Sequence, residues 1–221
     1  MKNTYKFDYD FEKAERNKKL SRYFFGALRW VLEIAAVILL AYILVVYTVE
    51  QTDVLGHSME PVLTEGDTII INKLAFRKDN PERYDLIVFR QGGEEHMYYD
   101  IKRVIGLPGE TIRIADGEIY ITSPDTSEEV MLLEPYKVEP MLLSGFAAEP
   151  ITLDEDEFFV LGDNRNNSED SRFSTVGNVV KDDIVGMAWI RINPFSLINK
   201  SNKDYVRPTP TPIGFVPESA E

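Results

Sequence analysis

A serine and a lysine, each inside a dense local motif, are the residues of this sequence best suited to do chemistry. Ser58 lies in Gly-His-Ser-Met-Glu-Pro at 56–61, and Lys102 lies in Ile-Lys-Arg-Val-Ile-Gly-Leu-Pro-Gly-Glu at 101–110. A hydroxyl becomes a useful nucleophile when a neighbouring base removes its proton, and a neutral lysine amine can do this. The two motifs together indicate nucleophilic catalysis by a Ser/Lys pair.

The residues around Lys102 indicate how a lysine there could serve as a base. Ile101 precedes it, and Val104 and Ile105 follow Arg103, so one face of a strand could place the amine against apolar surface. Burial disfavours the charged form of an amine, and a base needs the neutral form. Each residue alone has an ordinary alternative, because a serine beside glycine is usually a turn residue and a Lys-Arg pair is usually solvated.

Composition argues against several other kinds of site. The chain has no cysteine, which excludes a thiol nucleophile, disulfides and thiolate metal ligands. A histidine-based triad is disfavoured because His57, adjacent to Ser58, would point to the opposite face of an extended chain, while His96 lies in a loop-like run. The formal charge of the chain is −13. We interpret its scattered carboxylates as solvated groups on the surface. We therefore expect no metal and no cofactor.

A third motif, Gly-Asp-Asn-Arg-Asn-Asn-Ser-Glu-Asp-Ser-Arg, occupies residues 162–172. Its residues are turn formers, but its length and order argue against a simple polar turn. Taken in this order behind an apolar segment, the three motifs resemble the type I signal peptidases of Gram-positive type. These are membrane-bound Ser/Lys proteases that remove secretory signal peptides. The resemblance runs from about Thr52 to Asn193, with a variable stretch in the middle.

The resemblance implies a role for each matching residue. Ser58 would attack the scissile carbonyl to form an acyl-enzyme, and Lys102 would act as general base and then protonate the leaving amine. Ser168 matches a serine that hydrogen-bonds the catalytic amine and helps to orient it. Supporting ion pairs, with Arg103 as the expected partner of Asp163, are implied at Asp163, Asp170, Arg172 and Arg103.

The resemblance also implies how the substrate binds. The Ser58 N–H would be one oxyanion donor, and the second stays open because Gly56 stands where some relatives have a serine. The expected substrates are secretory preproteins with small-x-small cleavage sites, bound as an added strand along residues 100–102. Asp100 replaces an aromatic residue found there in some relatives. The side chains expected to contact the substrate are Ile101, Val88 and Met59.

The elements that must position these residues begin with a membrane segment at residues 30–49. This segment is apolar apart from Glu33, which can pair with Arg29. Twenty helical residues span about 30 Å, the thickness of a bilayer core. The preceding residues are rich in Lys and Arg, so the positive-inside rule predicts a single-pass plasma-membrane protein with residues 1–29 in the cytoplasm and the rest outside. A phospholipid bilayer is therefore an expected partner.

A cleavable signal peptide and a buried helix of a soluble protein are the alternatives to an anchor. The long polar N-terminus and the lack of a small-x-small site at 47–51 weigh against the first, and the lack of a polar face weighs against the second. Fewer than ten residues separate the anchor from Ser58. We therefore expect Ser58 close to the membrane, with Met59 and neighbouring apolar residues in contact with lipid.

The pattern after the anchor is typical of strands. Asp116-Gly117 is a strong hairpin signal, and no long amphipathic helix follows residue 50. The predicted fold class is mainly β, an antiparallel β-sheet catalytic domain of signal-peptidase type over 50–199 behind one N-terminal transmembrane helix. Short β-branched or aromatic runs predict its strands at 68–72, 85–89, 111–114, 118–121, 157–161 and 184–192.

Two segments of this outer part are expected to lie outside the catalytic core. The acidic, irregular stretch 122–156 falls where the family carries a variable subdomain, and we expect an insertion or cap there. The tail 200–221 contains four prolines and is predicted to be disordered. Residues 50–221 carry sixteen basic and thirty-two acidic side chains, which disfavours nucleic acid as a partner.

Other Ser/Lys proteins and one non-enzyme are the alternatives to a signal peptidase. Self-processing repressor proteases usually carry a DNA-binding domain, for which this acidic chain offers no basic element. β-Lactam-binding acyl enzymes place a lysine three residues after the serine on a helix, where this chain has Pro61. A non-enzymatic membrane-anchored binding protein would fold normally and show no effect of Ser58→Ala on preprotein processing.

Overall fold

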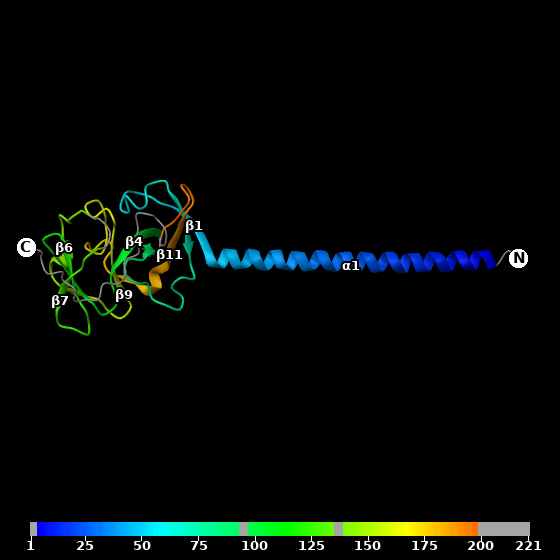
Figure 1. The fold of residues 1–221 in the computed structure, drawn as a ribbon, viewed down its shortest axis with the longest axis horizontal. Helices are drawn as coiled ribbons and strands as arrows, with labels where there is room; N and C mark the ends of the chain where they lie inside the picture. The colour runs from blue at the N-terminus through cyan, green and yellow to red at the C-terminus, as the bar shows by residue number, and fades with distance from the viewer. Residues whose placement is uncertain (1–3, 93–96, 135–138, 199–221) are drawn as a thin grey trace, which may run out of the picture. The chain divides into compact units, whose positions relative to one another are not determined.

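The computed structural model of the chain describes residues 4–92, 97–134 and 139–198. It divides into two compact units, Met1–Tyr47 and Thr48–Glu221. The first unit is a single helix, and the second contains the strands (Figure 1). The tail 200–221 and His96 both lie outside the described residues, so the predictions made for them stay predictions.

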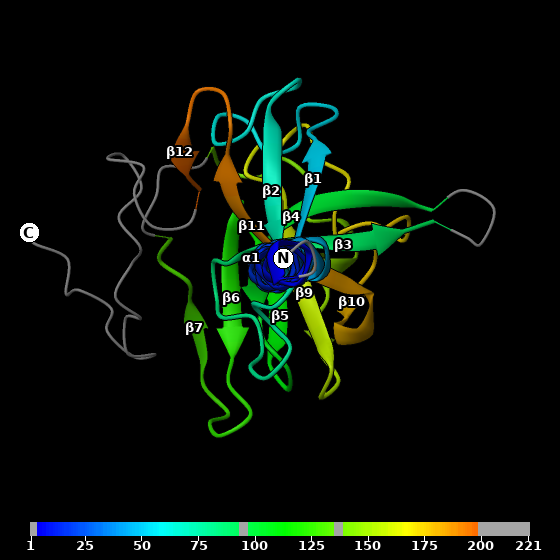
Figure 2. The same ribbon diagram turned by 90° about the vertical axis from the view of Figure 1, so that its right-hand side faces the viewer.

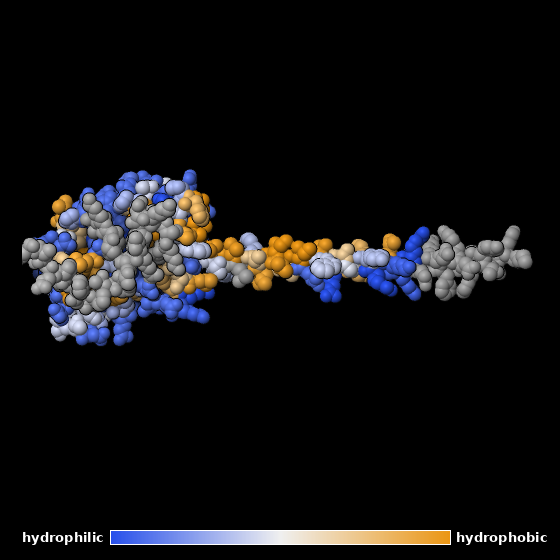
Figure 3. Space-filling view, viewed as in Figure 1, coloured by the Kyte–Doolittle hydropathy of each residue, from blue (hydrophilic) through white to orange (hydrophobic). Residues whose placement is uncertain are grey.

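Helix α1, Thr4–Thr48, makes up the described part of the first unit. By length and composition, its part Lys18–Thr48 could cross a membrane. Figure 3 shows a mainly apolar surface along the C-terminal part of the helix and a hydrophilic surface over residues nearer its N-terminal end. The most apolar window has no buried residue, so the segment does not have the packing of a buried core helix. Arg29 Nε donates to Glu33 Oε1 at 2.8 Å, the pairing predicted from their spacing.

The second unit contains two antiparallel sheets, which confirms the mainly β fold class (Figure 2). The larger sheet has the order β1-β2-β11-β3-β4-β9-β10, with β12 paired to β11. Its strands are β1 Val49–Asp53, β2 Thr68–Asn72, β3 Leu86–Gln91, β4 Tyr98–Gly106, β9 Glu157–Leu161, β10 Val179–Val180, β11 Ile184–Arg191 and β12 Ser196–Leu197.

The smaller sheet has the order β7-β6-β5-β8. Its strands are β7 Glu129–Met131, β6 Glu118–Thr122, β5 Thr111–Ala115 and β8 Ile151–Thr152. Two 3-10 helices complete the regular structure of the described part of this unit, η1 Gly145–Ala148 and η2 Lys181–Asp183.

The β5–β6 hairpin follows from its local sequence. Asp116 and Gly117 form the two-residue loop, with φ angles of 53° and 82°. A two-residue turn with positive φ at both positions matches the twist of the strands it joins, and aspartate and glycine tolerate that backbone best. Alternate isoleucines on both strands are buried in one core cluster with Met141 and Leu153. The hairpin was therefore predictable from sequence alone.

Strand β4 carries Lys102 and lies in the interior of the larger sheet, between β3 and β9. It pairs with β3 over residues 98–103 and with β9 from Arg103 onward. From Ile101 to Gly106 every residue is buried. Apolar residues of this stretch enter three different core clusters. Lys102 and Arg103, which lie within this buried stretch, therefore need polar partners.

The stretch 122–156 is part of the smaller sheet. It supplies β7, which pairs with β6, and β8, which pairs with β5. Its Met141, Ala147 and Leu153 are buried in the same core cluster as the β5–β6 isoleucines. These three side chains therefore belong to the core of the sheet, whereas Leu133, Leu142, Leu143 and Phe146 of the same segment are exposed.

Candidate active site

Ser58 lies in a turn that packs against the core of the larger sheet. The turn follows β1, and its Met59 and Leu63 are buried in the first core cluster. Leu63 N donates to Met59 O at 2.9 Å, and Glu60 N donates to His57 O at 3.3 Å. The two buried side chains anchor the turn, while Ser58, directly before Met59, stays partly exposed.

The third motif holds the same turn from the other side through Asn164. Its backbone N donates to Ser58 O at 3.0 Å, and its side-chain Nδ2 donates to His57 O at 3.0 Å. Gly162 makes this approach possible, since a Cβ there would lie 2.5 Å from Ser58 O and 2.2 Å from Ser168 Oγ. Asn164 is thus a positioning residue for the turn. Sequence reasoning treated it only as a turn former within the motif.

The structure brings Ser58 and Lys102 together although 44 residues separate them. Lys102 Nζ donates to Ser58 Oγ at 3.2 Å. The lysine side chain is only 2% exposed, and the residue opposite it on β3 is Ile87. A hydroxyl and a buried amine in direct hydrogen-bond contact are the arrangement that a nucleophile and its base require.

Lys102 has a second partner, Asp100, which precedes it by two residues on β4. The Asp100 carboxylate accepts a hydrogen bond from the Lys102 amine. Residues two apart on a strand share a face, so the sequence contained the signal for this contact. Sequence reasoning considered Asp100 only as a contact for substrate.

His57 is engaged away from Ser58. Its Nδ1 lies 2.8 Å from Glu60 Oε1, and its Nε2 lies 3.6 Å from Glu65 Oε2. The hydrogen bond to Glu60 raises the pKa of His57 above its usual value, and the charges of Glu60 and Glu65 act in the same direction. The stabilisation from these contacts is therefore complete below the unfolded-state pKa and is lost as pH rises through the folded-state pKa.

Arg103, which follows Lys102 on β4, forms a buried two-pronged ion pair with Asp163. Arg103 Nε and Nη2 donate to the two Asp163 carboxylate oxygens, each at 2.6 Å. Both side chains are nearly fully buried. The pair connects β4 to the loop after β9, which carries Asn164, so it fixes the third motif relative to Lys102.

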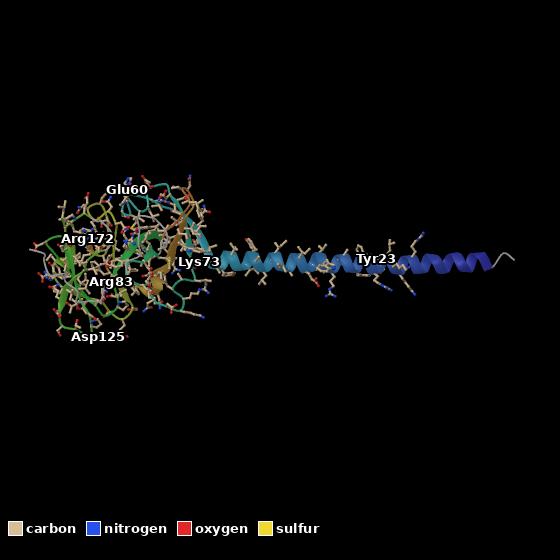
Figure 4. All side chains as sticks on the ribbon, viewed as in Figure 1. Tyr23, Glu60, Lys73, Arg83, Asp125 and Arg172 are labelled. Carbon is tan, nitrogen blue, oxygen red and sulfur yellow. The ribbon has the colours of Figure 1, made fainter. Side chains whose placement is uncertain are left out.

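Asp170 and Arg172 form a second buried ion pair, within the third motif. Arg172 Nε donates to Asp170 Oδ1 at 2.7 Å, and Gly162 N donates to Asp170 Oδ2 at 3.1 Å. Arg172 lies inside the body of the second unit (Figure 4) and also donates to Leu143 O at 3.0 Å. The motif is therefore tied to the 122–156 stretch, a connection that Arg165 strengthens by pairing with Glu134.

Ser168 lies against Gly162 at the back of the Ser58 turn. Its hydroxyl donates to Glu169 O at 3.4 Å. Within the described ranges, no hydrogen bond joins Ser168 to Lys102, so the part expected of Ser168 in orienting the amine stays a prediction.

The three residues expected to contact substrate all belong to the first core cluster. Ile101 is 7% exposed and Val88 is fully buried. Met59 is 2% exposed, so the expectation that it touches lipid is wrong. Its side chain turns inward to anchor the Ser58 turn, and Leu55, at 84% exposed, is the nearby apolar side chain that faces outward.

Over residues 4–92, 97–134 and 139–198, no group of three or more His, Asp or Glu side chains is arranged to hold a metal ion. The carboxylates nearest the site are engaged by cations instead, as in the pairs Asp100–Lys102 and Asp163–Arg103.

Replacing Asn164 by alanine is expected to lower the cleavage rate about five- to tenfold without unfolding the protein. The change removes the hydrogen bond to His57 O, and one such bond contributes about 1 kcal/mol. The measurement is kcat/KM on a cleavable substrate together with the melting temperature. Asn166→Ala is the matched control, because Asn166 contacts Leu142 and Pro140 but not the Ser58 turn. Equal losses in both variants would contradict the positioning role.

Comparisons with known proteins match this chain to a single family. The family model described as signal peptidase, peptidase S26, matches residues 27–193. A probable signal peptidase I-2 of Synechocystis is 33% identical over 73% of this chain and 71% of its own length. Signal peptidase I P of Bacillus subtilis subsp. natto is 32% identical, covering 79% of this chain and 92% of that protein.

Two further proteins extend the comparison. Signal peptidase I of Bacillus licheniformis is 30% identical over 86% of this chain and 99% of its own length. A crystal structure of a signal peptidase I from Enterococcus faecalis is 31% identical, covers 49% of this chain and 97% of that chain, and has a TM-score of 0.38. The chain belongs to the signal peptidase family, peptidase S26, and is a serine endopeptidase.

Proposed function

We propose that this protein removes signal peptides from secreted preproteins with Ser58 as nucleophile and Lys102 as general base. The observation that carries the proposal is the 3.2 Å contact between Lys102 Nζ and Ser58 Oγ, made by a lysine buried on β4, an interior strand of the larger sheet. Family membership supports the reaction class, and the contact supports the assignment of the two residues.

Acylation begins with proton transfer inside this contact. Neutral Lys102 takes the Ser58 proton as Oγ attacks the scissile carbonyl, and the carbonyl electron pair moves onto its oxygen. When the tetrahedral intermediate collapses, the C–N bond breaks and the Lys102 ammonium returns the proton to the leaving amine. The mature protein departs with a free amino terminus, and the signal peptide stays on Ser58 as an ester.

Deacylation repeats the same transfers with water as the nucleophile. Lys102, neutral again, takes a proton from the water that attacks the ester, and then protonates Ser58 Oγ as the ester bond breaks. The oxyanion formed in both steps needs donors. We assign the Ser58 N–H as one donor and leave the second unassigned, because Gly56 has no hydroxyl.

The open edge of β4 is the proposed binding place for the residues before the cut. Among described residues, β9 pairs with β4 only from Arg103 onward, which leaves Tyr98–Lys102 without a strand on that side. A peptide that adds as a strand there would bring its carbonyl to Ser58. Ile101, Val88 and Met59 lie below this edge in a packed core, which favours small side chains, such as alanine, at the first and third positions before the cut.

The proposed domain organisation places this site outside the cell, close to the membrane. Residues 30–49 would span the bilayer, residues 1–29 would lie in the cytoplasm, and residues 50–199 would form the catalytic domain. Fewer than ten residues connect the span to Ser58, a reach of at most about 30 Å. A signal peptide still in the bilayer would present its cleavage site at that depth.

The proposed orientation predicts the result of a protease-protection experiment. Protease added outside intact cells should digest the chain after Glu50 and leave residues 1–29 intact, because only the former would be accessible. Fragments are identified with antibodies to each end, and permeabilised cells show that residues 1–29 can be digested. Protection of the large domain in intact cells would reverse the orientation.

The proposed activity is tested by incubating the detergent-solubilised full chain with a purified secretory preprotein. We expect one cut, after a small-x-small sequence, identified by sequencing the new N-terminus of the product. A preprotein with a large residue at the first position before the cut serves as the control and should stay uncut. Cleavage at unrelated sites, or none, would contradict the proposal.

A further inference from the structure

Asp100 is a third polar group at the Ser58–Lys102 contact, and the two-residue mechanism does not use it. One of its carboxylate oxygens accepts hydrogen bonds from the Lys102 amine and from Ile101 N, the latter at 2.8 Å. The second bond holds the carboxylate along the strand, so the oxygen faces the amine from a fixed direction. Lys102 therefore lies between Asp100 and Ser58.

We propose that Asp100 is a positioning residue that completes a Ser58–Lys102–Asp100 triad. It holds the amine against Ser58 and stabilises the ammonium that forms when Lys102 takes the Ser58 proton. The inference rests on the function proposed above. A catalytic triad needs a nucleophile in contact with a base, and a third group that orients the base. The two hydrogen bonds of Lys102 supply both contacts.

Burial makes the Asp100 contact important. The Lys102 side chain is 2% exposed and the Asp100 side chain 18%. An ammonium that forms with so little water around it needs a counter-charge, since an unpartnered buried charge is costly and a charge-assisted hydrogen bond is strong. Asp100 takes no part in the proton transfers, and the proton moves only between Ser58, Lys102 and the leaving amine.

The other charged groups on the elements around Lys102 are held by different partners or point away. Arg90, on β3, lies opposite Tyr99 and is exposed. Among the residues that the structure describes, Asp100 is thus the carboxylate that contacts the Lys102 amine. The remaining groups form separate interactions, namely Arg103 with Asp163, Glu50 with Lys73 and Tyr99, and His57 with Glu60 and Glu65.

Removing the Asp100 charge should have two opposite effects on the rate. The carboxylate favours the protonated amine, so its loss should move the acidic limb of the kcat/KM profile to lower pH. Where the amine is neutral in both proteins, the variant lacks the counter-charge for the ammonium in the transition state, and kcat/KM should fall. A residue that served only to hold the fold would lower the rate equally at every pH.

The test is the pH profile of kcat/KM for preprotein cleavage by the detergent-solubilised full chain. For Asp100→Asn we expect the acidic limb to move to lower pH and the plateau to fall about tenfold or more. Asp100→Glu, which keeps the charge, should retain the wild-type limb. Asp53→Asn is the matched control, because the Asp53 carboxylate contacts Thr68 Oγ, and its profile should follow wild type.

An unmoved acidic limb in Asp100→Asn, or a loss of rate that is uniform across pH, would overturn the triad. Ser58→Ala and Lys102→Met are measured beside it. If those two variants still cleave, the proposed function fails. If they are inactive and Asp100→Asn keeps the wild-type profile, only the part assigned to Asp100 fails.

Discussion

Replacing Ser58 by alanine or Lys102 by methionine is expected to reduce preprotein cleavage about 10⁴-fold or more while leaving the fold intact. Alanine removes the nucleophilic oxygen. Methionine fills the space of the buried lysine side chain but has no amine to accept the proton. Lys102→Arg should fail as well, because a guanidinium stays protonated and cannot act as a base. The measurement is single-turnover cleavage of a preprotein by the full chain in detergent.

Matched substitutions outside the site separate loss of chemistry from loss of structure. Ser174→Ala changes an exposed serine, and Lys181→Met changes a lysine that contacts Asn80 on the surface. Both variants should cleave at the wild-type rate. Measurable turnover by Lys102→Arg at neutral pH would contradict the assignment of Lys102 as the base, whatever the controls show.

Replacing Asp170 by alanine is expected to destabilise the second unit by about 3–5 kcal/mol, the loss typical of removing one partner of a buried ion pair. Arg172 would keep a buried charge without its carboxylate, and Gly162 N would lose its acceptor. Since Gly162 and Asn164 hold the Ser58 turn, activity should fall together with stability. The measurement is denaturant unfolding of the full chain in detergent, followed by tryptophan fluorescence.

Glu129→Ala is the control for this stability prediction. Glu129 forms a comparable two-pronged pair with Arg113, with a bond of 2.7 Å from Arg113 Nε, but on the surface. The bond lowers the pKa of Glu129, so its small contribution is present above the unfolded-state pKa and is lost as pH falls through the folded-state pKa. Exposed pairs contribute about 0–1 kcal/mol. Equal destabilisation by the two substitutions would show that burial does not set the strength of the Asp170 pair.

The elements that local sequence specifies were predictable. The apolar run at 30–49 lies within α1 except for Val49, which begins β1. Asp116-Gly117 placed the hairpin because two positive φ angles are a local requirement of its turn. Strand signals at 68–72 and 157–161 correspond to β2 and β9 with the same bounds. Except for Val49, each of these patterns lies within the element it predicts.

Contacts between distant segments could not be obtained in this way. By residue type, Asn164 is a turn former like its neighbours in the motif. Nothing near it in the sequence indicates that it donates hydrogen bonds to the carbonyls of His57 and Ser58. The same holds for Glu134, whose pairing with Arg165 joins the 122–156 stretch to the third motif. Such contacts depend on sheet order and on which loops meet, which local propensity does not encode.

Met59 and Asp100 show how a correct motif can still be misinterpreted. An apolar residue beside the proposed nucleophile, close in sequence to the expected membrane span, predicts lipid contact, but the turn directs Met59 into the core and leaves Leu55 outside. Asp100 was visible as a strand neighbour of Lys102. Its ion pair with Lys102 follows from their spacing of two on one strand, whereas the apolar neighbours of Lys102 indicate only that the amine is buried.

We propose that an amine at position 102 is the base, and chemical restoration of that amine is a direct test of this claim. The chain has no cysteine, so Lys102→Cys carries a single thiol, which can be aminoethylated in denaturant before refolding to give a side chain close to lysine in length. The cysteine-free wild type, treated identically, should keep its activity. We predict that Lys102→Cys does not cleave a preprotein and that the aminoethylated protein regains cleavage at the wild-type bond. Cleavage by unmodified Lys102→Cys, or a refolded aminoethylated protein that stays inactive, would contradict the claim.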